Sequence, residues 1–91
     1  MPQKFTYLIC YDISEPKLLH KTAHYLEKIG GTRLQKSVFI LSLPQHQIHR
    51  IKDHLKQMIG IKHHVMVIPI CNLCLNKAEF LGESPALYYL L

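Results

Sequence analysis

The chain has 91 residues, a formal net charge of +5 and 48% hydrophobic residues. This length indicates one small domain rather than two, and the positive charge suits a polyanion better than a small acidic ligand, although a solvated basic surface would carry the same charge. No apolar stretch approaches the roughly 20 residues of a membrane span, so no membrane partner is expected. Three cysteines without a signal-peptide pattern predict a reducing, cytoplasmic location.

The first expected element is a buried strand from Phe5 to Tyr11, a run of aromatic and branched residues. Asp12 follows at its carboxyl end, where α/β sheets expose functional groups. A helix should come next, because Ser14 can cap it, Pro16 fits its first turn and Gly30-Gly31 ends it. Its apolar positions fall at helical spacing at Leu18, Leu19, Ala23, Leu26 and Ile29.

The second half of the domain repeats this alternation. Thr32 to Leu43 contains the β-favouring run from Ser37 to Ile40, which predicts a strand or two strands joined by a tight bend. Pro44 then opens a second amphipathic helix that stops at Gly60. Val65 to Ile70 predicts another buried strand, and Lys77 to Leu81 a last short one.

The order β-α-β-β-α-β with an extra C-terminal strand is that of the α+β ferredoxin-like fold. We expect the domain to span residues 1–82 and a C-terminal tail to span residues 83–91. Both helices should cover one face of an antiparallel sheet and leave the other face exposed and apolar. Because a monomer rarely tolerates such a face, a homodimer that packs through the sheet face is expected. The apolar tail should dock on a partner.

Asp12 is the natural candidate for chemistry, since the only other aspartate in the sequence, Asp53, lies inside a charged helical stretch. Magnesium takes one or two protein carboxylates and completes its octahedron with water and phosphate oxygens. A single Asp12 per chain supplies only one carboxylate ligand, so the second carboxylate would come from a twin subunit. The alternative is that Asp12 only satisfies backbone donors at the helix entrance.

Phosphate handling near Asp12 needs hydrogen-bond donors. Arg33 presents a planar fork for phosphate oxygens, and Ser37 and Gln35 add further groups. In a regular strand these three side chains share a face with Phe39, and a bulge would break that register. Phe39 and Tyr11 could stack on bases or pack in the core or a dimer, and packing is favoured for Phe39. Further candidate nucleic-acid contacts are Lys17, Lys21 and Lys36.

The histidines and cysteines give weaker signals. Seven histidines are present without an H-E-x-x-H pattern, so a surface role is expected for most of them. Cys71 and Cys74 could form half of a zinc site with His63 or His64, but a buried pair at a strand end is favoured.

Three motifs follow one another along the chain: Tyr11-Asp12-Ile13-Ser14, Gly31-Thr32-Arg33-Leu34-Gln35-Lys36-Ser37-Val38-Phe39 and Ile68-Pro69-Ile70-Cys71-Asn72-Leu73-Cys74. They resemble the three signatures of CRISPR-associated protein two, the small subunit of the spacer-acquisition machinery. The resemblance implies a ferredoxin-like homodimer with metal-dependent endonuclease activity on RNA or DNA. It also implies Asp12 as catalytic and metal-binding residue, Mg2+ or Mn2+ as cofactor, and a partnership with the integrase, CRISPR-associated protein one.

Two other interpretations remain open. A basic dimer could hold duplex DNA and bridge integrase subunits without cleaving anything, and a toxin-like ribonuclease could share the same fold. The substitution Asp12→Asn discriminates catalysis from bridging, because it removes a metal ligand while keeping the shape of the side chain.

Overall fold

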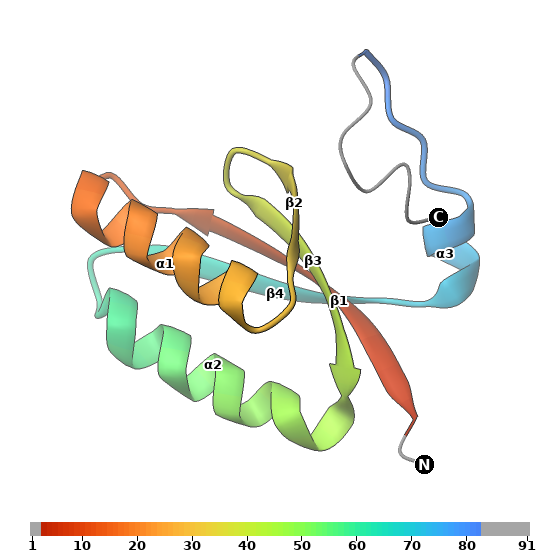
Figure 1. The fold of residues 1–91 in the computed structure, drawn as a ribbon, viewed down its shortest axis with the longest axis horizontal. Helices are drawn as coiled ribbons and strands as arrows, with labels where there is room; N and C mark the ends of the chain where they lie inside the picture. Colours follow the sequence, from red (N-terminus) through yellow and green to blue (C-terminus); the bar gives the residue numbers. More distant parts are fainter. Residues whose placement is uncertain (1–2, 83–91) are drawn as a thin grey trace.

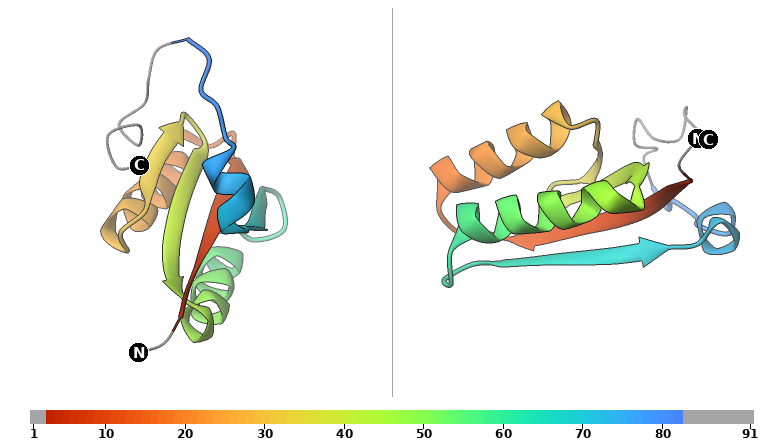
Figure 2. Two further views of the ribbon diagram at one scale, coloured as in Figure 1. Left: turned by 90° about the vertical axis from the view of Figure 1, so that its right-hand side faces the viewer. Right: turned by 90° about the horizontal axis from the view of Figure 1, so that it is seen from below.

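The computed structural model describes residues 3–82 of the chain. Its elements are β1 (Lys4–Asp12), α1 (Pro16–Lys28), β2 (Thr32–Gln35), β3 (Val38–Pro44), α2 (Gln45–Ile59), β4 (His64–Ile70) and α3 (Asn72–Asn76). The strands form one antiparallel sheet in the order β2-β3-β1-β4. Figures 1 and 2 show α1 and α2 side by side over one face of this sheet. This arrangement is the predicted α+β ferredoxin-like fold.

The helix ends follow local sequence signals closely, with one exception. Glu15, and not the predicted Ser14, is the N-cap residue of α1, and its side chain makes no capping hydrogen bond. Pro16 occupies the first helical position, where its missing N–H costs nothing. Gly30 follows the helix with φ of +98°, a conformation that glycine adopts without strain. As predicted, α2 follows Pro44 and ends at Gly60.

The core lies between the sheet and the two long helices. Alternate strand residues face the helices, and Ile9 from β1, Phe39 from β3 and Leu26 from α1 are fully buried. Thr22 of α1 is also fully buried, and its hydroxyl donates to the sulfur of Met58 in α2 at 3.6 Å. Burial of each large apolar side chain, such as Ile9, Phe39 or Leu26, contributes on the order of 2 kcal/mol to the free energy of unfolding. The sheet face under the helices therefore supplies most of the stability of the domain.

The chain after β4 differs from the prediction. Lys77 to Leu81 forms no strand, and α3, which the sequence did not predict, precedes it. The N–H of Lys77 donates to the carbonyl of Leu73 at 3.3 Å, and that of Ala78 to Leu75 at 3.2 Å. Because these donors already close the end of α3, they are not available for a strand ladder. The expected extra C-terminal strand is therefore wrong for these residues.

The sheet face away from the helices is partly covered by this segment. Leu75, Ala78 and Phe80 line a cavity of about 210 Å³ together with sheet residues such as Ile40 and Ile70. The face that we expect to be exposed and apolar is thus covered at one end by the chain's own residues, and it leaves Met66 59% exposed. The predicted tail, residues 83–91, lies outside the described residues. No helix within residues 3–82 is long and apolar enough to cross a membrane.

Candidate functional site

Asp12 is the last residue of β1, and its side chain is exposed. Since Tyr11 is buried under the helices, alternation along the strand directs Asp12 to the open face of the sheet. On the neighbouring strand β4 the partner of Asp12 is His64. Directly opposed residues share a face, with Cβ atoms about 5 Å apart. The fold therefore brings a carboxylate and an imidazole together at one end of the open face.

The backbone before Asp12 is fixed by the turn between β2 and β3. The N–H of Tyr11 donates to the carbonyl of Ser37 at 3.0 Å, and its hydroxyl donates to the carbonyl of Lys36 at 3.4 Å. Burial raises the pKa of Tyr11, and the nearby Arg33 guanidinium partly opposes this effect. Two of the predicted nucleic-acid contacts, Lys36 and Ser37, are thus placed beside the strand end that carries Asp12.

A β-bulge separates the remaining residues predicted to bind phosphate. Arg33 pairs with Phe39 and Gln35 with Val38, so that Leu34 is the extra residue of β2. Consecutive residues of β3 point to opposite faces, so Arg33 lies on the helical face and Gln35 on the open face. The bulge that would break the shared face is therefore present, and Gln35 does not share a face with Arg33 and Phe39.

Arg33 is engaged on the helical face rather than beside Asp12. Its guanidinium carbon lies 5.3 Å from the ring centroid of Phe39, and its Nη2 lies 3.8 Å from Oε1 of Glu27. The Arg33 side chain is 46% exposed, so the ion pair with Glu27 is solvated and weak. Arg33 remains accessible to a phosphate, but on the other side of the sheet from the carboxylate.

The two aromatic candidates belong to the core. Tyr11 and Phe39 stack on each other with ring centroids 6.3 Å apart, and Phe39 is 0% exposed. Neither ring offers a free face to a nucleobase or to a twin subunit, because α1, α2 and the sheet enclose both. Of the alternatives for these residues, base stacking and dimer packing do not fit the structure, and core packing does.

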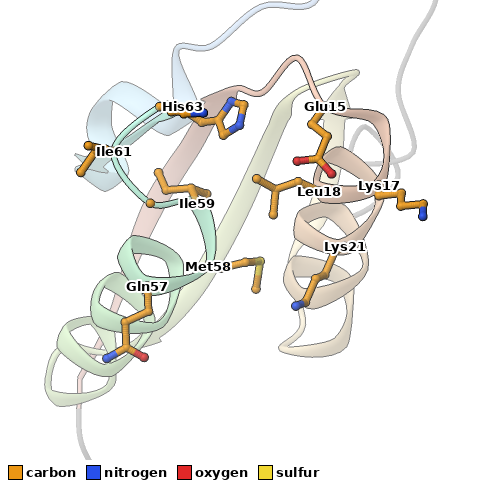
Figure 3. Close-up of a pocket in the computed structure, with 11 residues that line it drawn as sticks. Glu15, Lys17, Leu18, Lys21, Gln57, Met58, Ile59, Ile61 and His63 are labelled. Carbon is orange, nitrogen blue, oxygen red and sulfur yellow. The ribbon is translucent and has the colours of Figure 1, made fainter.

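Lys17 and Lys21 line a cleft between α1 and α2. The cleft has a volume of about 560 Å³ and is also lined by Lys62 and His63 from the loop before β4. Figure 3 shows Leu18 and Met58 pointing toward each other between the helices, with Glu15 and His63 at one end. Lys62 escaped sequence reasoning because only the packing of the two helices brings it near α1. The cleft is a cationic surface at the same end of the sheet as Asp12.

The zinc interpretation of the cysteines does not fit. His64 begins β4 and Cys71 follows its last residue, so the strand holds them about 23 Å apart at 3.3 Å per residue. His63 lies one residue further away. Within residues 3–82 no three His, Cys, Asp or Glu side chains gather closely enough to hold a metal ion. Among the described residues, Asp12 therefore belongs to no cluster of three potential metal ligands.

His64 is the site residue that sequence reasoning missed. It was treated as one of several surface histidines at a strand entrance. The signal that would have found it is the antiparallel register between β1 and β4, which places it opposite Asp12. That register is a long-range property, and the pattern of either strand alone does not contain it.

The fold and this strand-end carboxylate define a class: small ferredoxin-like α+β domains that expose one aspartate at the end of the first strand. The family described as CRISPR associated protein Cas2 matches residues 5–78. This chain belongs to that family.

Two curated relatives agree with the family match. The protein named CRISPR-associated endoribonuclease Cas2 1 of Methanospirillum hungatei JF-1 is 33% identical over 80 residues, covering 85% of this chain and 82% of the relative. The CRISPR-associated endoribonuclease Cas2 of Korarchaeum cryptofilum is 32% identical over 78 residues, covering 85% and 84%.

Solved structures show the same fold. A crystal structure of the hypothetical protein TT1823 from Thermus thermophilus superposes with a TM-score of 0.79 and 24% identity, covering 91% of this chain and 96% of that one. A crystal structure of cas2 superposes with a TM-score of 0.70 and 20% identity, covering 92% and 93%. At these identities the likeness concerns the fold alone.

Proposed function

We propose that this chain is a CRISPR-associated endonuclease that cleaves phosphodiesters of RNA or DNA with Mg2+ or Mn2+ bound between two Asp12 carboxylates of a homodimer. The observation that carries the proposal is the exposed Asp12 at the end of β1, on a sheet face that the chain leaves partly uncovered. The endoribonuclease names of the two relatives support the reaction class.

The uncovered part of the sheet face supports the dimer. Cys10, Val38 and Met66 form one row across the strands, next to Asp12, and Met66 is 59% exposed. The segment from α3 to Phe80 covers the other end of the face only. A second copy related by a two-fold axis near this row would bury its apolar side chains. The same axis would bring the two Asp12 carboxylates together.

The chemistry follows from the ligand types at that axis. Carboxylate oxygens suit magnesium and manganese, which, when bound, activate a water and screen charge that develops on the phosphate. His64, opposite Asp12, can hydrogen-bond the carboxylate and fix its orientation, or carry a proton at the cleaved bond. Gln35 on the open face, and Lys36 and Ser37 in the turn beside the end of β1, offer hydrogen bonds to a nucleic acid.

A DNA-bridging role for the integrase, CRISPR-associated protein one, is the second candidate. One observation favours it: Arg33, the residue best suited to clamp a phosphate, faces α1 and pairs with Glu27 instead of facing Asp12. The lysine-lined cleft also lies on the helical side. Nucleic acid held there would be bound and not cut. In this role the dimer is a scaffold that spans the DNA between integrase subunits.

The test compares Asp12→Asn with Asp53→Asn, since Asp53 is exposed on α2 and is the only other aspartate of the sequence. With Mg2+ or Mn2+, Asp12→Asn should lower the cleavage rate of labelled RNA and DNA by roughly a hundredfold or more, as loss of one key electrostatic group does. Asp53→Asn should cleave like the wild type. Both variants should keep the wild-type mass in sedimentation and its salt-sensitive DNA binding.

Three outcomes contradict the nuclease proposal. Undiminished cleavage by purified Asp12→Asn would assign the activity to other residues or to a contaminant. Equal losses in the two variants would show that the effect is not specific to Asp12. Wild-type protein that binds DNA but cleaves nothing with either ion would leave the scaffold as the function.

A further inference from the structure

Cys71 and Cys74 lie at the start of α3, and the site proposed above uses neither of them. Both side chains are exposed. Cys71 is the N-cap residue of α3, and Cys74 follows within the same helical turn. The backbone N–H of Cys74 donates to Sγ of Cys71 at 3.4 Å, which places the Cys71 sulfur against the residue that carries the second thiol.

This geometry is compatible with a bond between the two sulfur atoms. Residues three apart on a helical turn have Cβ atoms about 5–6 Å apart, and a disulfide needs Cβ atoms about 3.5–4.5 Å apart. Closing the bond therefore requires side-chain rotation and a small backbone adjustment. The segment from Cys71 to Cys74, which begins α3, is exposed, so no core packing resists that adjustment.

The two thiols differ in the way that exchange chemistry requires. Hydrogen bonding from the backbone N–H groups of Cys74 and Leu73 lowers the pKa of Cys71. The pKa of Cys74 is raised, first because its protonated thiol hydrogen-bonds to the Cys71 side chain and second because negative charge on the Cys71 sulfur disfavours another one beside it. Cys71 is thus the attacking thiol and Cys74 the one that reacts second.

Other partners for Cys71 are absent from the part of the chain that the structure describes. Cys10 pairs with Met66, which precedes Cys71 by five residues, so Cys10 lies roughly 16 Å from Cys71 along the sheet at 3.3 Å per residue. The histidines that could complete a zinc site are at the far end of the same strand. Because the described residues offer no third zinc ligand near these two thiols, disulfide exchange is the chemistry that suits the pair.

We propose that Cys71 and Cys74 are a redox-active dithiol that closes reversibly to a disulfide by exchange with a low-molecular-weight disulfide, such as oxidised glutathione. The Cys71 thiolate attacks one sulfur of the reagent, breaks its S–S bond and releases one glutathione thiolate. Cys74 then loses its proton to solvent and attacks Sγ of Cys71, which releases the second glutathione thiolate. Two electrons pass from the protein dithiol to the reagent.

Closure of this disulfide would act on the open sheet face and not on Asp12. Cys74 lines the apolar cavity that Leu75 and Phe80 close over Ile40 and Ile70. A bond between the two cysteines fixes the first turn of α3 above this cavity, at the end of the sheet opposite the carboxylate. The inference is independent of the proposed nuclease function, since it needs neither metal nor a second subunit.

The test exposes the full chain to defined ratios of reduced to oxidised glutathione, followed by acid quenching, alkylation of free thiols and peptide mass mapping. The wild type and Cys10→Ser should convert to a form with a Cys71–Cys74 disulfide, reversed by excess reduced glutathione. Cys74→Ser should accumulate a mixed disulfide with glutathione at Cys71, because the second thiol is missing. Cys71→Ser should show neither product.

Alkylation of the reduced, folded wild-type protein gives a second readout of the same pair that needs no variant. At neutral pH, Cys71 should react several-fold faster than the half-buried Cys10. Equal or slower reaction of Cys71 would overturn the proposal. So would free thiols at both positions in the most oxidising mixture, or exclusive formation of disulfides between molecules.

Discussion

The two faces of the sheet differ in how completely other parts of the chain bury them. The face under α1 and α2 is closed by fully buried side chains such as Ile9 and Phe39. The other face is covered at one end by α3 and the residues up to Phe80, and it leaves Met66 and Asp12 exposed at the other end. The first face therefore carries the stability of the monomer. The second face is available for recognition, assembly and chemistry.

This division explains how a chain of 91 residues can be stable and still leave charged and apolar side chains exposed on one face of its sheet. A small domain has little free energy to spare, of the order of 5–15 kcal/mol in total. Because the face under the helices is densely packed, the other face can leave the Asp12 carboxylate and the apolar row of Cys10, Val38 and Met66 outside the core. The predictions below test whether the two faces can be changed independently.

The largest effect should come from Phe39→Ala compared with Met66→Ala. Removal of the Phe39 ring leaves a cavity under the helices and also removes its contacts with Tyr11 and Arg33, at a cost of about 3–5 kcal/mol. Met66→Ala should change the unfolding free energy of dilute protein by less than about 0.5 kcal/mol. Urea unfolding measures both.

Met66→Ala also tests whether a second subunit covers the open face. If a second subunit covers Met66, the cost of this variant should grow as the protein concentration rises, because dimerisation is linked to folding. Similar costs for the two variants at low concentration would refute the assignment of stability to one face.

An intermediate effect is expected from Tyr11→Phe, with a characteristic dependence on pH. Loss of the hydrogen bond to the Lys36 carbonyl should cost about 0.5–1.5 kcal/mol, at the lower end because its length is 3.4 Å. Burial raises the folded-state pKa of Tyr11 above its usual value of 10.0, so the wild type should lose stability as the pH rises through that range.

Tyr11→Phe lacks this ionisation and should decline less. The difference in stability between the two proteins should therefore shrink from about pH 9 to about pH 11. Tyr25, whose pKa is also raised by burial, contributes equally to both proteins and cancels in the comparison. A constant difference across this range would show that the Tyr11 hydroxyl does not ionise differently on folding.

The smallest effect belongs to the open face. Thr6 and Ser42 share a hydrogen bond of 2.8 Å between their hydroxyl groups, exposed to water on neighbouring strands. Thr6→Val keeps the β-branched shape and should change stability by no more than about 0.5 kcal/mol, and a double-mutant cycle with Ser42→Ala should give a coupling of similar size. A coupling well above 1 kcal/mol would show that the open face stabilises the monomer after all.

The element order of the domain could be predicted from the sequence because its signals are local. Apolar periodicity, Pro16 at the start of α1 and Gly60 at the end of α2 report on the residues that form those elements. The stretch Lys77 to Leu81 misled this reasoning. Its first four residues alternate between charged and apolar, as in a half-buried strand, but the backbone donors at its start are used to end a helix.

The candidate site was predictable in part for the same reason. Asp12 stands at a strand end that the sequence alone reveals. The bulge at Leu34 and the pairing of Asp12 with His64 depend on strand register, which is set by contacts between distant parts of the chain. These two features moved Arg33 to the far face and added His64, and no local pattern predicts either change.

The hydrogen bonds of Tyr11 have a consequence for the entropy of binding at the neighbouring residue. Asp12 is exposed, but the chain just before it is pinned to the turn at Lys36 and Ser37. Ordering the backbone of a free residue costs roughly 1–2 kcal/mol of conformational entropy. Tyr11, the residue before the carboxylate, is already ordered in the folded protein, so binding does not have to order it. A ligand that engages Asp12 has to restrict little more than the side-chain torsions, so weak individual contacts suffice to hold it.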